Sequence, residues 1–356
     1  MKILLLGEFS ALHKNLKEGL LELGHEAVVA GCGDGFKKVP VDISFDSDLP
    51  SILGSACRRL KPLLNLIHMQ GFDVVQLVNP FIFKIKYFPG EYFLDRIINN
   101  NKKFFLLGAG DDAYFWQYGR KLLKYGPFDD VLKYDLKAES CFLESEASFR
   151  YNKKVLDLAN GLIPVAYEYE VSYKTEFKKR LRTIPIPINT REIGFQENKV
   201  ANKITVFHGL NRYGFKGTRH VEEAFEFLSK KYPNDLELII AGQMPLNEYL
   251  KIMRRTNVVV DQLYSHSLGL NGIYALAMGK IVMGGAEPES LRSLGVEVSP
   301  VINLNPNAQS LIDEIEKLLA MRDQISKISV ESREFAEKVH CHIKVAQKYV
   351  ETWNSH

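Results

Sequence analysis

The loop at residues 208–218 carries residue types that bind an anion. Two cations, Arg212 and Lys216, stand four positions apart in it, and Asn211 adds a side-chain amide. Glycines such as Gly217 let the backbone come close to a ligand, and the loop precedes an expected helix whose first amides lack partners. These features favour a diphosphate ligand, although the loop matches neither a Walker A motif nor a GxGxxG fingerprint. The alternative is a surface loop with incidental charges.

A second loop, after the valine run at 258–260, has similar chemistry. It contains Gly269, Leu270 and Asn271 directly before a helix of small residues. Both loops follow buried strands, so the amides at the start of this helix predict a second anion contact at the same sheet edge. His208 ends the strand before the first loop. It would either donate a hydrogen bond to the same ligand or serve as a buried structural histidine.

Short apolar runs alternate with helical patterns along the chain, which is typical of an α/β protein with parallel sheets. Residues 2–7 form one such run, and a turn-rich passage at 184–189 interrupts the alternation before it restarts. We predict two doubly wound, Rossmann-like domains facing across a cleft, at residues 1–188 and 189–335, with ligands at the carboxyl ends of the strands. The helical stretch at 336–356 is expected to pack back on the N-terminal domain.

Composition restricts the function classes. At 356 residues the chain is long enough for two domains, and its net charge of +3 is too small for a dedicated nucleic-acid binder. No apolar stretch approaches the roughly 20 residues of a membrane-spanning helix, and the N-terminus lacks the apolar region of a secretory signal. The four cysteines form no CxxC pair and the histidines no HExxH spacing, so we predict no metal site. These features predict a cytoplasmic protein.

Three short clusters in the first half interleave lysine or arginine with apolar and aromatic residues. They lie at residues 84–88, 102–105 and 120–124. Such clusters can touch an anionic lipid surface, which would place the protein peripherally at the inner face of the membrane. The alternative, which we favour, is a set of solvated helix faces.

The two loops and the paired α/β pattern resemble the GT-B glycosyltransferases, specifically the retaining family 4 enzymes that build bacterial capsule, exopolysaccharide and lipopolysaccharide chains. The likeness rests on the cation pair and on residues 269–279, which are similar to the family's GxxxEAMAxG segment. It implies that the second domain binds a nucleotide-diphosphate sugar, with Arg212 and Lys216 on the diphosphate. It also implies that the first domain binds a glycan or lipid-linked acceptor, and that the reaction is retaining and needs neither a metal nor another cofactor.

The sequence departs from this family at two positions. The family has two glutamates, separated by seven residues, where this chain has His266 and Tyr274. In the family the second glutamate binds the ribose hydroxyls and the first contacts the transferred sugar, so a donor contact at Tyr274 would not be a carboxylate. Glu287 and Glu289, after the next expected strand, are candidate replacements because their loop opens at the same sheet edge. The alternative is a solvated turn.

On the acceptor side, residues 108–112 resemble the HGSD-like loop of the family. Asp111 would hydrogen-bond an acceptor hydroxyl or steady the reacting centre, and Asp112 is either a second contact or the cap of the following helix. Gly7 and Ser10 follow the first strand at the expected border of the same cleft, with a helix N-cap as the alternative for Ser10.

The leading interpretation is a glycosyltransferase of the hexosyl-transferring type, with Asp111 and His208 as catalytic candidates. Two alternatives remain open. One is a sugar-nucleotide epimerase of GT-B fold. The other is a degenerate protein that binds a nucleotide sugar without catalysis, which the loss of both glutamates would explain.

Overall fold

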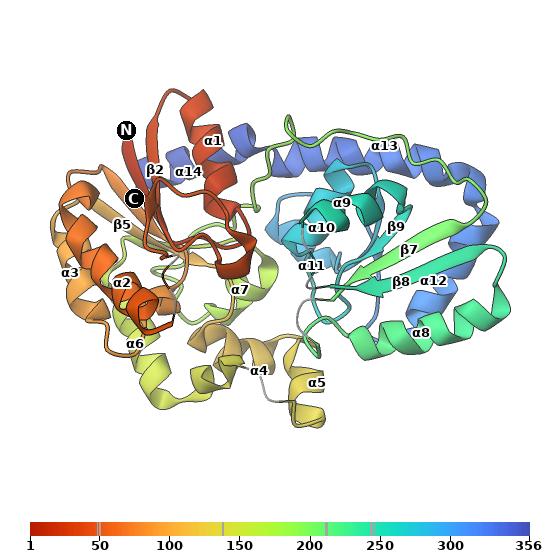
Figure 1. Cartoon of the computed structure of the whole chain (residues 1–356), viewed down its shortest axis with the longest axis horizontal. Helices are drawn as coiled ribbons and strands as arrows, with labels where there is room; N and C mark the ends of the chain where they lie inside the picture. Colours follow the sequence, from red (N-terminus) through yellow and green to blue (C-terminus); the bar gives the residue numbers. More distant parts are fainter. Residues whose placement is uncertain (48, 50, 137–138, 211–212, 243, 245) are drawn as a thin grey trace. The chain divides into compact units, whose positions relative to one another are not determined.

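The structure is a computed structural model that describes residues 1–47, 49, 51–136, 139–210, 213–242, 244 and 246–356. It divides the chain into two units (Figure 1). The first comprises residues 1–118, 140–189 and 341–356, and the second comprises residues 119–139 and 190–340. Each unit is built on one parallel sheet. No helix in the described ranges is both long and apolar enough to cross a bilayer.

The first unit contains a six-stranded sheet in the order β3-β2-β1-β4-β5-β6. Its strands are β1 (Lys2–Leu6), β2 (Glu26–Gly31), β3 (Ile43–Ser44), β4 (Val74–Leu77), β5 (Lys103–Gly108) and β6 (Gly161–Pro164). Helices cover both faces of the sheet, so nearly every position of β1, β4 and β5 is buried and these strands appear in the sequence as continuous apolar runs. The order reverses between β1 and β4, where sheets of this kind bind ligands.

Alternate residues of the central strand enter two separate cores. Ile3 and Leu5 join the cluster under α1 (Leu12–Glu22) and α14 (His342–Ser355), whereas Leu4 and Leu6 join the cluster under α3 (Gly90–Asn99) and α6 (Glu146–Leu158). The helices of this unit are α1 (Leu12–Glu22), α2 (Ser51–Leu64), α3 (Gly90–Asn99), α6 (Glu146–Leu158), α7 (Tyr167–Ser172) and α14 (His342–Ser355).

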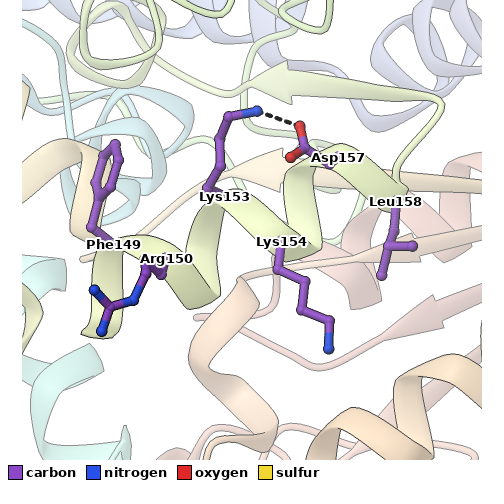
Figure 2. Close-up of a pocket in the computed structure, with 6 residues that line it drawn as sticks. All are labelled: Phe149, Arg150, Lys153, Lys154, Asp157 and Leu158. Atoms are coloured by element: carbon purple, nitrogen blue, oxygen red, sulfur yellow. Dashed lines mark hydrogen bonds and ion pairs between the residues drawn. The ribbon is translucent and has the colours of Figure 1, made fainter. Parts of the chain in front are cut away.

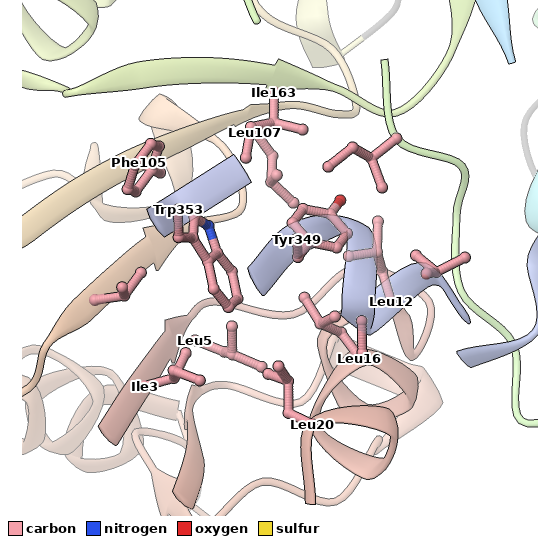
Figure 3. Close-up of a cluster of buried hydrophobic side chains, with 14 of the residues drawn as sticks. Ile3, Leu5, Leu12, Leu16, Leu20, Phe105, Leu107, Ile163, Tyr349 and Trp353 are labelled. Atoms are coloured by element: carbon pink, nitrogen blue, oxygen red, sulfur yellow. The ribbon is translucent and has the colours of Figure 1, made fainter. Parts of the chain in front are cut away.

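Helix α14 completes the core of the first unit although it follows every other helix in the sequence. It lies beside α1 (Figure 1), and its Tyr349 and Trp353 are fully buried near Leu16 (Figure 3). The two helices approach closely because α1 has Gly19 at the contact, where a Cβ would lie 2.3 Å from the His342 carbonyl oxygen. The helical stretch expected from residue 336 is interrupted, because residues 336–340 form a π-helical turn of the second unit.

Cys341 stands at the N-cap of α14, where the chain returns to the first unit. The next residue, His342, is fully buried, and its Nε2 lies 3.0 Å from Glu22 Oε1 on α1. Hydrogen bonding with His342, together with the helix amides of Ile343 and Lys344, outweighs burial and lowers the pKa of the Cys341 thiol to about 6.

We expect iodoacetamide to alkylate Cys341 faster than Cys32 at pH 6.5, because burial raises the pKa of the Cys32 thiol. A larger thiolate fraction is partly offset by lower nucleophilicity, which leaves an advantage of roughly five- to tenfold. Peptide-resolved mass spectrometry measures both rates in one sample. His342→Gln should remove the advantage, and equal rates at the two thiols in the wild type would contradict the expectation.

The second unit contains a five-stranded sheet in the order β11-β10-β9-β7-β8. Its strands are β7 (Ile204–Gly209), β8 (Leu236–Ala241), β9 (Val258–Val260), β10 (Ile281–Gly284) and β11 (Ile302–Asn303). Its longer helices are α8 (Thr218–Lys231), α9 (Leu246–Arg255), α10 (Leu270–Ala277), α11 (Pro288–Ser293), α12 (Ala308–Ala320) and α13 (Ile325–Phe335). The order reverses between β7 and β9, so the residues after these two strands lie at the switch point of this sheet.

Residues 119–139, which the sequence analysis placed in the N-terminal domain, cluster with the second unit. The Tyr264 hydroxyl donates to Asp130 Oδ1 at 2.9 Å, and the Arg219 guanidinium lies 3.6 Å from the centre of the Tyr134 ring. Such side-chain contacts between distant segments leave no periodic signal in the sequence. The segment carries α4 (Arg120–Leu122) and α5 (Phe128–Lys133).

Candidate functional site

Polar groups gather at the switch point of the second sheet, where β7 and β9 end. Asp261 directly follows β9 and is fully buried. Its Oδ2 accepts a hydrogen bond from Gly269 N at 2.7 Å, and Lys216 Nζ lies 3.6 Å from its Oδ1. Because the Lys216 side chain is only 16% exposed, its ammonium is held at the sheet edge. This edge therefore carries one cation whose position is fixed by a buried carboxylate.

The start of α10, which the sequence predicts as an anion contact, already faces a carboxylate. A Cβ at Gly272 would lie 2.8 Å from Asp261 Oδ2, so the carboxylate covers the first turn of the helix. The predicted anion contact at the amides of this helix start therefore lies beside a carboxylate that already accepts a hydrogen bond from Gly269 N, and it stays a prediction. Leu270, Asn271 and Tyr274 are half-buried on the same short helix.

Asn271 has a buried hydrogen-bond donor at this edge of the sheet. Its Oδ1 accepts a hydrogen bond from the Tyr249 hydroxyl, whereas its Nδ2 is buried with no hydrogen-bond partner among the described residues. A Cβ placed at Gly209 would lie 3.6 Å from this Nδ2, so the amide faces the end of β7. Buried donors without partners are uncommon in folded proteins, and one aimed at the end of a strand suits a ligand oxygen.

His208, the predicted catalytic histidine of this unit, is enclosed in the protein. Its ring is fully buried, with Nδ1 2.9 Å from the Val260 carbonyl oxygen and Nε2 3.1 Å from Thr218 Oγ1. Burial, reinforced by the nearby Lys216 charge, lowers its pKa to about 4. The neutral ring thus ties β7 to β9 and to the start of α8. This geometry corrects the predicted role in favour of the structural alternative.

Two predicted donor contacts, Asn211 and Arg212, lie outside the described residues. The end of their loop is described: Gly217 is the N-cap of α8 with φ +72°, and a Cβ there would lie 3.0 Å from Leu263 Cβ. As a glycine, Gly217 has no side chain that could cap α8. The first amides of a 14-residue helix therefore follow Lys216 directly, which is the arrangement that favours a bound anion.

Glu287, a candidate replacement for a family glutamate, is held in a buried network. Its Oε1 accepts hydrogen bonds from the Tyr125 hydroxyl at 2.6 Å and from Asn303 Nδ2 at 3.2 Å. Burial opposes ionisation, but these two bonds outweigh it and lower the pKa of Glu287. His266 stacks on Tyr125 at a ring separation of 4.3 Å. Glu289 is partly exposed in an ion pair on α11, so the solvated-turn alternative describes Glu289 and not Glu287.

In the first unit, the loop after β1 has a tight backbone. Gly7 has φ +87°, and a Cβ there would lie 2.3 Å from Ile82 Cδ1, so no other residue fits without rearrangement. Ser10 is not the N-cap of α1, which corrects that alternative: its amide donates to Asp34 Oδ2 at 2.8 Å, and its hydroxyl accepts from Lys37 Nζ at 2.5 Å.

Glu8 caps α1 from within the protein. It is 2% exposed, and its carboxylate accepts hydrogen bonds from His13 N at 3.2 Å and Lys14 N at 2.8 Å. Burial outweighs these bonds and raises the pKa of Glu8 to about 7. A buried carboxyl of this kind at the end of a central strand is a feature that the sequence analysis missed, because an acidic residue four positions before a helix is not a usual cap signal.

The loop at residues 108–112 lies beside this one. A Cβ at Gly110 would lie 2.7 Å from the Phe9 ring, and Asn79 Nδ2 donates to the Asp111 carbonyl oxygen at 3.1 Å. Asp111 itself is half-buried. The structure therefore brings the predicted acceptor-side loops together at the switch point of the first sheet, with Asn79, two residues after the end of β4, positioning one of them.

Asp112 is fully buried and has its own partners. Its Oδ1 accepts a hydrogen bond from Phe115 N and its Oδ2 one from the Tyr173 hydroxyl, both at 2.8 Å. It caps the following helical turn, as the alternative in the sequence analysis proposed. Burial raises the pKa of Asp112 to about 7.

We expect Asp112 to contribute a fall in the free energy of unfolding as the pH rises from about 4 to 7, because the folded protein binds its proton more tightly than the unfolded chain does. Asp112→Asn removes this proton and should reduce the fall by up to about 1.4 kcal/mol per pH unit. Urea unfolding across this pH range measures the slope. Glu26→Gln, on an exposed position of β2, is the control, and an unchanged slope in Asp112→Asn would contradict the assignment.

A shallow surface pocket of about 420 Å³ lies on α6, away from both switch points (Figure 2). Its three cations are each paired with a carboxylate: Arg150 with Glu146, Lys153 with Asp157 and Lys154 with Glu91. It therefore offers no unbalanced charge. Among the residues that the structure describes, no group of three or more His, Cys, Asp or Glu side chains is arranged to hold a metal ion.

No protein-family model matches the chain, and no curated protein matches its sequence. Solved structures match it over its full length. HepE from Anabaena, in complex with UDP and glucose, superposes with a TM-score of 0.62 at 12% identity and covers 100% of both chains. Sucrose-phosphate synthase from Thermosynechococcus elongatus gives a TM-score of 0.60 at 14% identity, covering 100% of this chain and 99% of that one. The chain has the GT-B fold.

The chain also resembles the structure of an epimerase. UDP-GlcNAc 2-epimerase from Neisseria meningitidis, bound to UDP-GlcNAc, gives a TM-score of 0.54 at 13% identity with 100% coverage of both chains. The predicted α/β fold class is thus confirmed, since two doubly wound parallel sheets are present and full-length GT-B structures match. At such identities the likeness concerns the fold, and the reaction must be argued from the residues.

Proposed function

We propose that the protein is a glycosyltransferase that takes a sugar from a nucleotide-diphosphate sugar. The observation that carries this proposal is the edge of the second sheet, near the ends of β7 and β9. The Lys216 ammonium, the start of α8 at Gly217 and the Asn271 Nδ2, which has no hydrogen-bond partner among the described residues, lie there. A fixed cation, a buried N–H donor and a helix N-terminus suit the diphosphate oxygens. The bound UDP and UDP-glucose of the similar HepE structures support the same ligand class.

In this proposal the diphosphate leaves with its charge stabilised by fixed groups rather than by a metal. Lys216 supplies a cation, and Asp261 holds that cation in place without contacting the donor. Preorganised charges of this kind are often the largest single contribution to catalysis. Arg212 would add a second cation. The half-buried Tyr274 would contact the ribose of the donor. Glu287 would support the loop after β10 through its hydrogen bonds with Tyr125 and Asn303.

The finer parts of the proposal follow the resemblance to the retaining family 4 enzymes. The transferred group would be a hexose, the configuration would be retained, and the acceptor would be a glycan or a lipid-linked sugar of capsule, exopolysaccharide or lipopolysaccharide synthesis in the cytoplasm. Asp111 is the acceptor-side candidate, whereas Asp112 is a positioning residue because it is fully buried.

A nucleotide panel tests the donor site. The unfolding midpoint is measured with UDP, GDP, ADP and CMP and with their sugar conjugates. A ligand at about 100 times its Kd should stabilise the protein by roughly 2.7 kcal/mol. Stabilisation by a single diphosphate base would support the site. The anomeric configuration of the transferred sugar, followed by NMR, then tests retention, and no stabilisation by any nucleotide would overturn the proposal.

An epimerase is the second candidate, favoured by the full-length likeness to the Neisseria enzyme. Such an enzyme would convert the sugar nucleotide to its epimer with no acceptor present. A transferase would leave it unchanged until an acceptor is added, and a degenerate binding protein would bind it without turnover in either assay.

A further inference from the structure

Helix α2 (Ser51–Leu64) exposes an apolar stripe to solvent. Leu53, Leu60 and Leu64 are 64%, 55% and 73% exposed, and Ile67 in the 3₁₀ turn that follows is 72% exposed. Their spacings of seven, four and three place the side chains on one face of the helix. A helix that packs on a core normally buries such a stripe. Single exposed apolar side chains are common, but four in one row mark an interaction surface.

Cations flank this stripe. Residues 51–64 contain Arg58, Arg59 and Lys61 and no acidic residue. Asp46, which precedes the helix, pairs with Arg58 at 3.3 Å and accepts a hydrogen bond from Lys61 through its carbonyl oxygen, and both side chains of the ion pair are partly exposed. The guanidinium of Arg59 lies 5.8 Å from the centre of the Tyr87 ring, and Tyr87 is 80% exposed. The helix therefore adjoins a loop that adds one large exposed aromatic ring to the stripe. We call Leu53, Leu60, Leu64, Ile67 and Tyr87 the α2 face.

The three clusters named from the sequence contribute unequally to this surface. Phe104 and Phe105 of the cluster at 102–105 are buried in β5, and its exposed Lys102 pairs with Asp73 at 2.7 Å, so that cluster offers no aromatic residue to the surface. The cluster at 120–124 belongs to the second unit. Only the cluster at 84–88 adjoins the α2 face, through Tyr87.

We propose that the α2 face docks on an anionic lipid bilayer, with its leucines in the headgroup region and its cations near lipid phosphates. An exposed apolar stripe bordered by arginine and lysine, with no carboxylate in the helix, is the pattern of helices that lie in a membrane interface. A protein partner would need a groove that combines apolar side chains with carboxylates at matching positions. An anionic bilayer offers an apolar interior and negatively charged headgroups over its whole surface. This docking requires no donor binding, so its test is independent of the proposed reaction.

Vesicle flotation of the full-length protein tests the inference. We expect binding to vesicles of phosphatidylglycerol and phosphatidylcholine in 50 mM salt, and at least tenfold weaker binding to phosphatidylcholine alone. The double variant Leu60→Gln/Leu64→Gln should weaken binding at least tenfold, because it removes two apolar side chains from the α2 face. Its unfolding midpoint should stay unchanged, because both side chains are exposed. Leu158→Gln, which is 43% exposed on α6, is the matched control and should bind as the wild type does.

Three results would overturn the inference. The first is no flotation of the wild type with anionic vesicles. The second is equal flotation of the wild type and the double glutamine variant, which would reduce the binding to general electrostatic attraction. The third is lipid-independent self-association that the double variant abolishes, which would assign the face to a second copy of the chain. If the double variant has a lower unfolding midpoint, Leu53→Gln/Ile67→Gln replaces it.

Discussion

Replacing Lys216 by methionine is expected to weaken nucleoside diphosphate binding by about 10- to 100-fold. A charge-assisted hydrogen bond to a phosphate contributes roughly 1.5–3 kcal/mol, and Lys216 is the described cation at the switch point of the second sheet. Methionine keeps most of the aliphatic stem, so packing is retained. Turnover should fall further, by about 100- to 1000-fold, because the charge on the departing diphosphate grows in the transition state. Isothermal calorimetry and a transfer assay measure the two effects.

The same substitution leaves the buried Asp261 carboxylate without its cation, so its effect on stability must be measured separately. The unfolding midpoint without ligand gives this effect, and calorimetry on the folded protein gives the affinity. Lys230→Met, an exposed position on α8, is the control and should change neither quantity. Unchanged affinity in Lys216→Met would remove the lysine from the donor site.

Trp353→Ala is expected to lower the free energy of unfolding of the first unit by about 3–5 kcal/mol, the usual cost of truncating a buried aromatic side chain. The ring is fully buried in the cluster between α14 and the sheet, so its truncation leaves a cavity there. Urea unfolding followed by the fluorescence of Trp116, which is buried in the same unit, measures the change.

The matched control for this prediction is Phe177→Ala. Phe177 is 70% exposed in the first unit, so its loss should change the free energy by less than about 0.5 kcal/mol. If Trp353→Ala lowers the free energy of unfolding no more than the control does, α14 contributes little to the stability of the first unit. The core around Trp353 would then not unfold cooperatively with the sheet.

The fold could be predicted from the sequence where burial imposes a pattern. The apolar run at residues 2–7 contains β1 (Lys2–Leu6), because helices cover both faces of a parallel sheet and leave such a run in the sequence. The assignment of residues 119–139 to the second unit could not be predicted. It depends on pairs such as Tyr264 with Asp130, whose partners are 134 positions apart and belong to no periodic pattern.

The sequence predicted where the candidate site residues lie in the chain, but not which groups their side chains contact. The sequence located the ends of β7 and β9 to within about two residues, since glycines and polar residues follow apolar runs there. It could not show that the carboxylates of Glu8 and Asp261 accept hydrogen bonds from backbone amides inside the protein. An acidic residue after a strand gives the same sequence pattern whether its side chain faces the protein interior or a ligand. His208 is a similar case, since burial of its ring depends on Val260 and Thr218 from other elements.

The position of α14 in the chain has a consequence for biosynthesis. Helices α1 and α14 cover the same region of the first sheet, and α14 leaves the ribosome after every other element of that unit. Vectorial synthesis can complete the second unit first, although it follows most of the first unit in the sequence. Until α14 emerges, Ile3, Leu5 and Leu16 lack their final covering and present an apolar surface that a chaperone can bind.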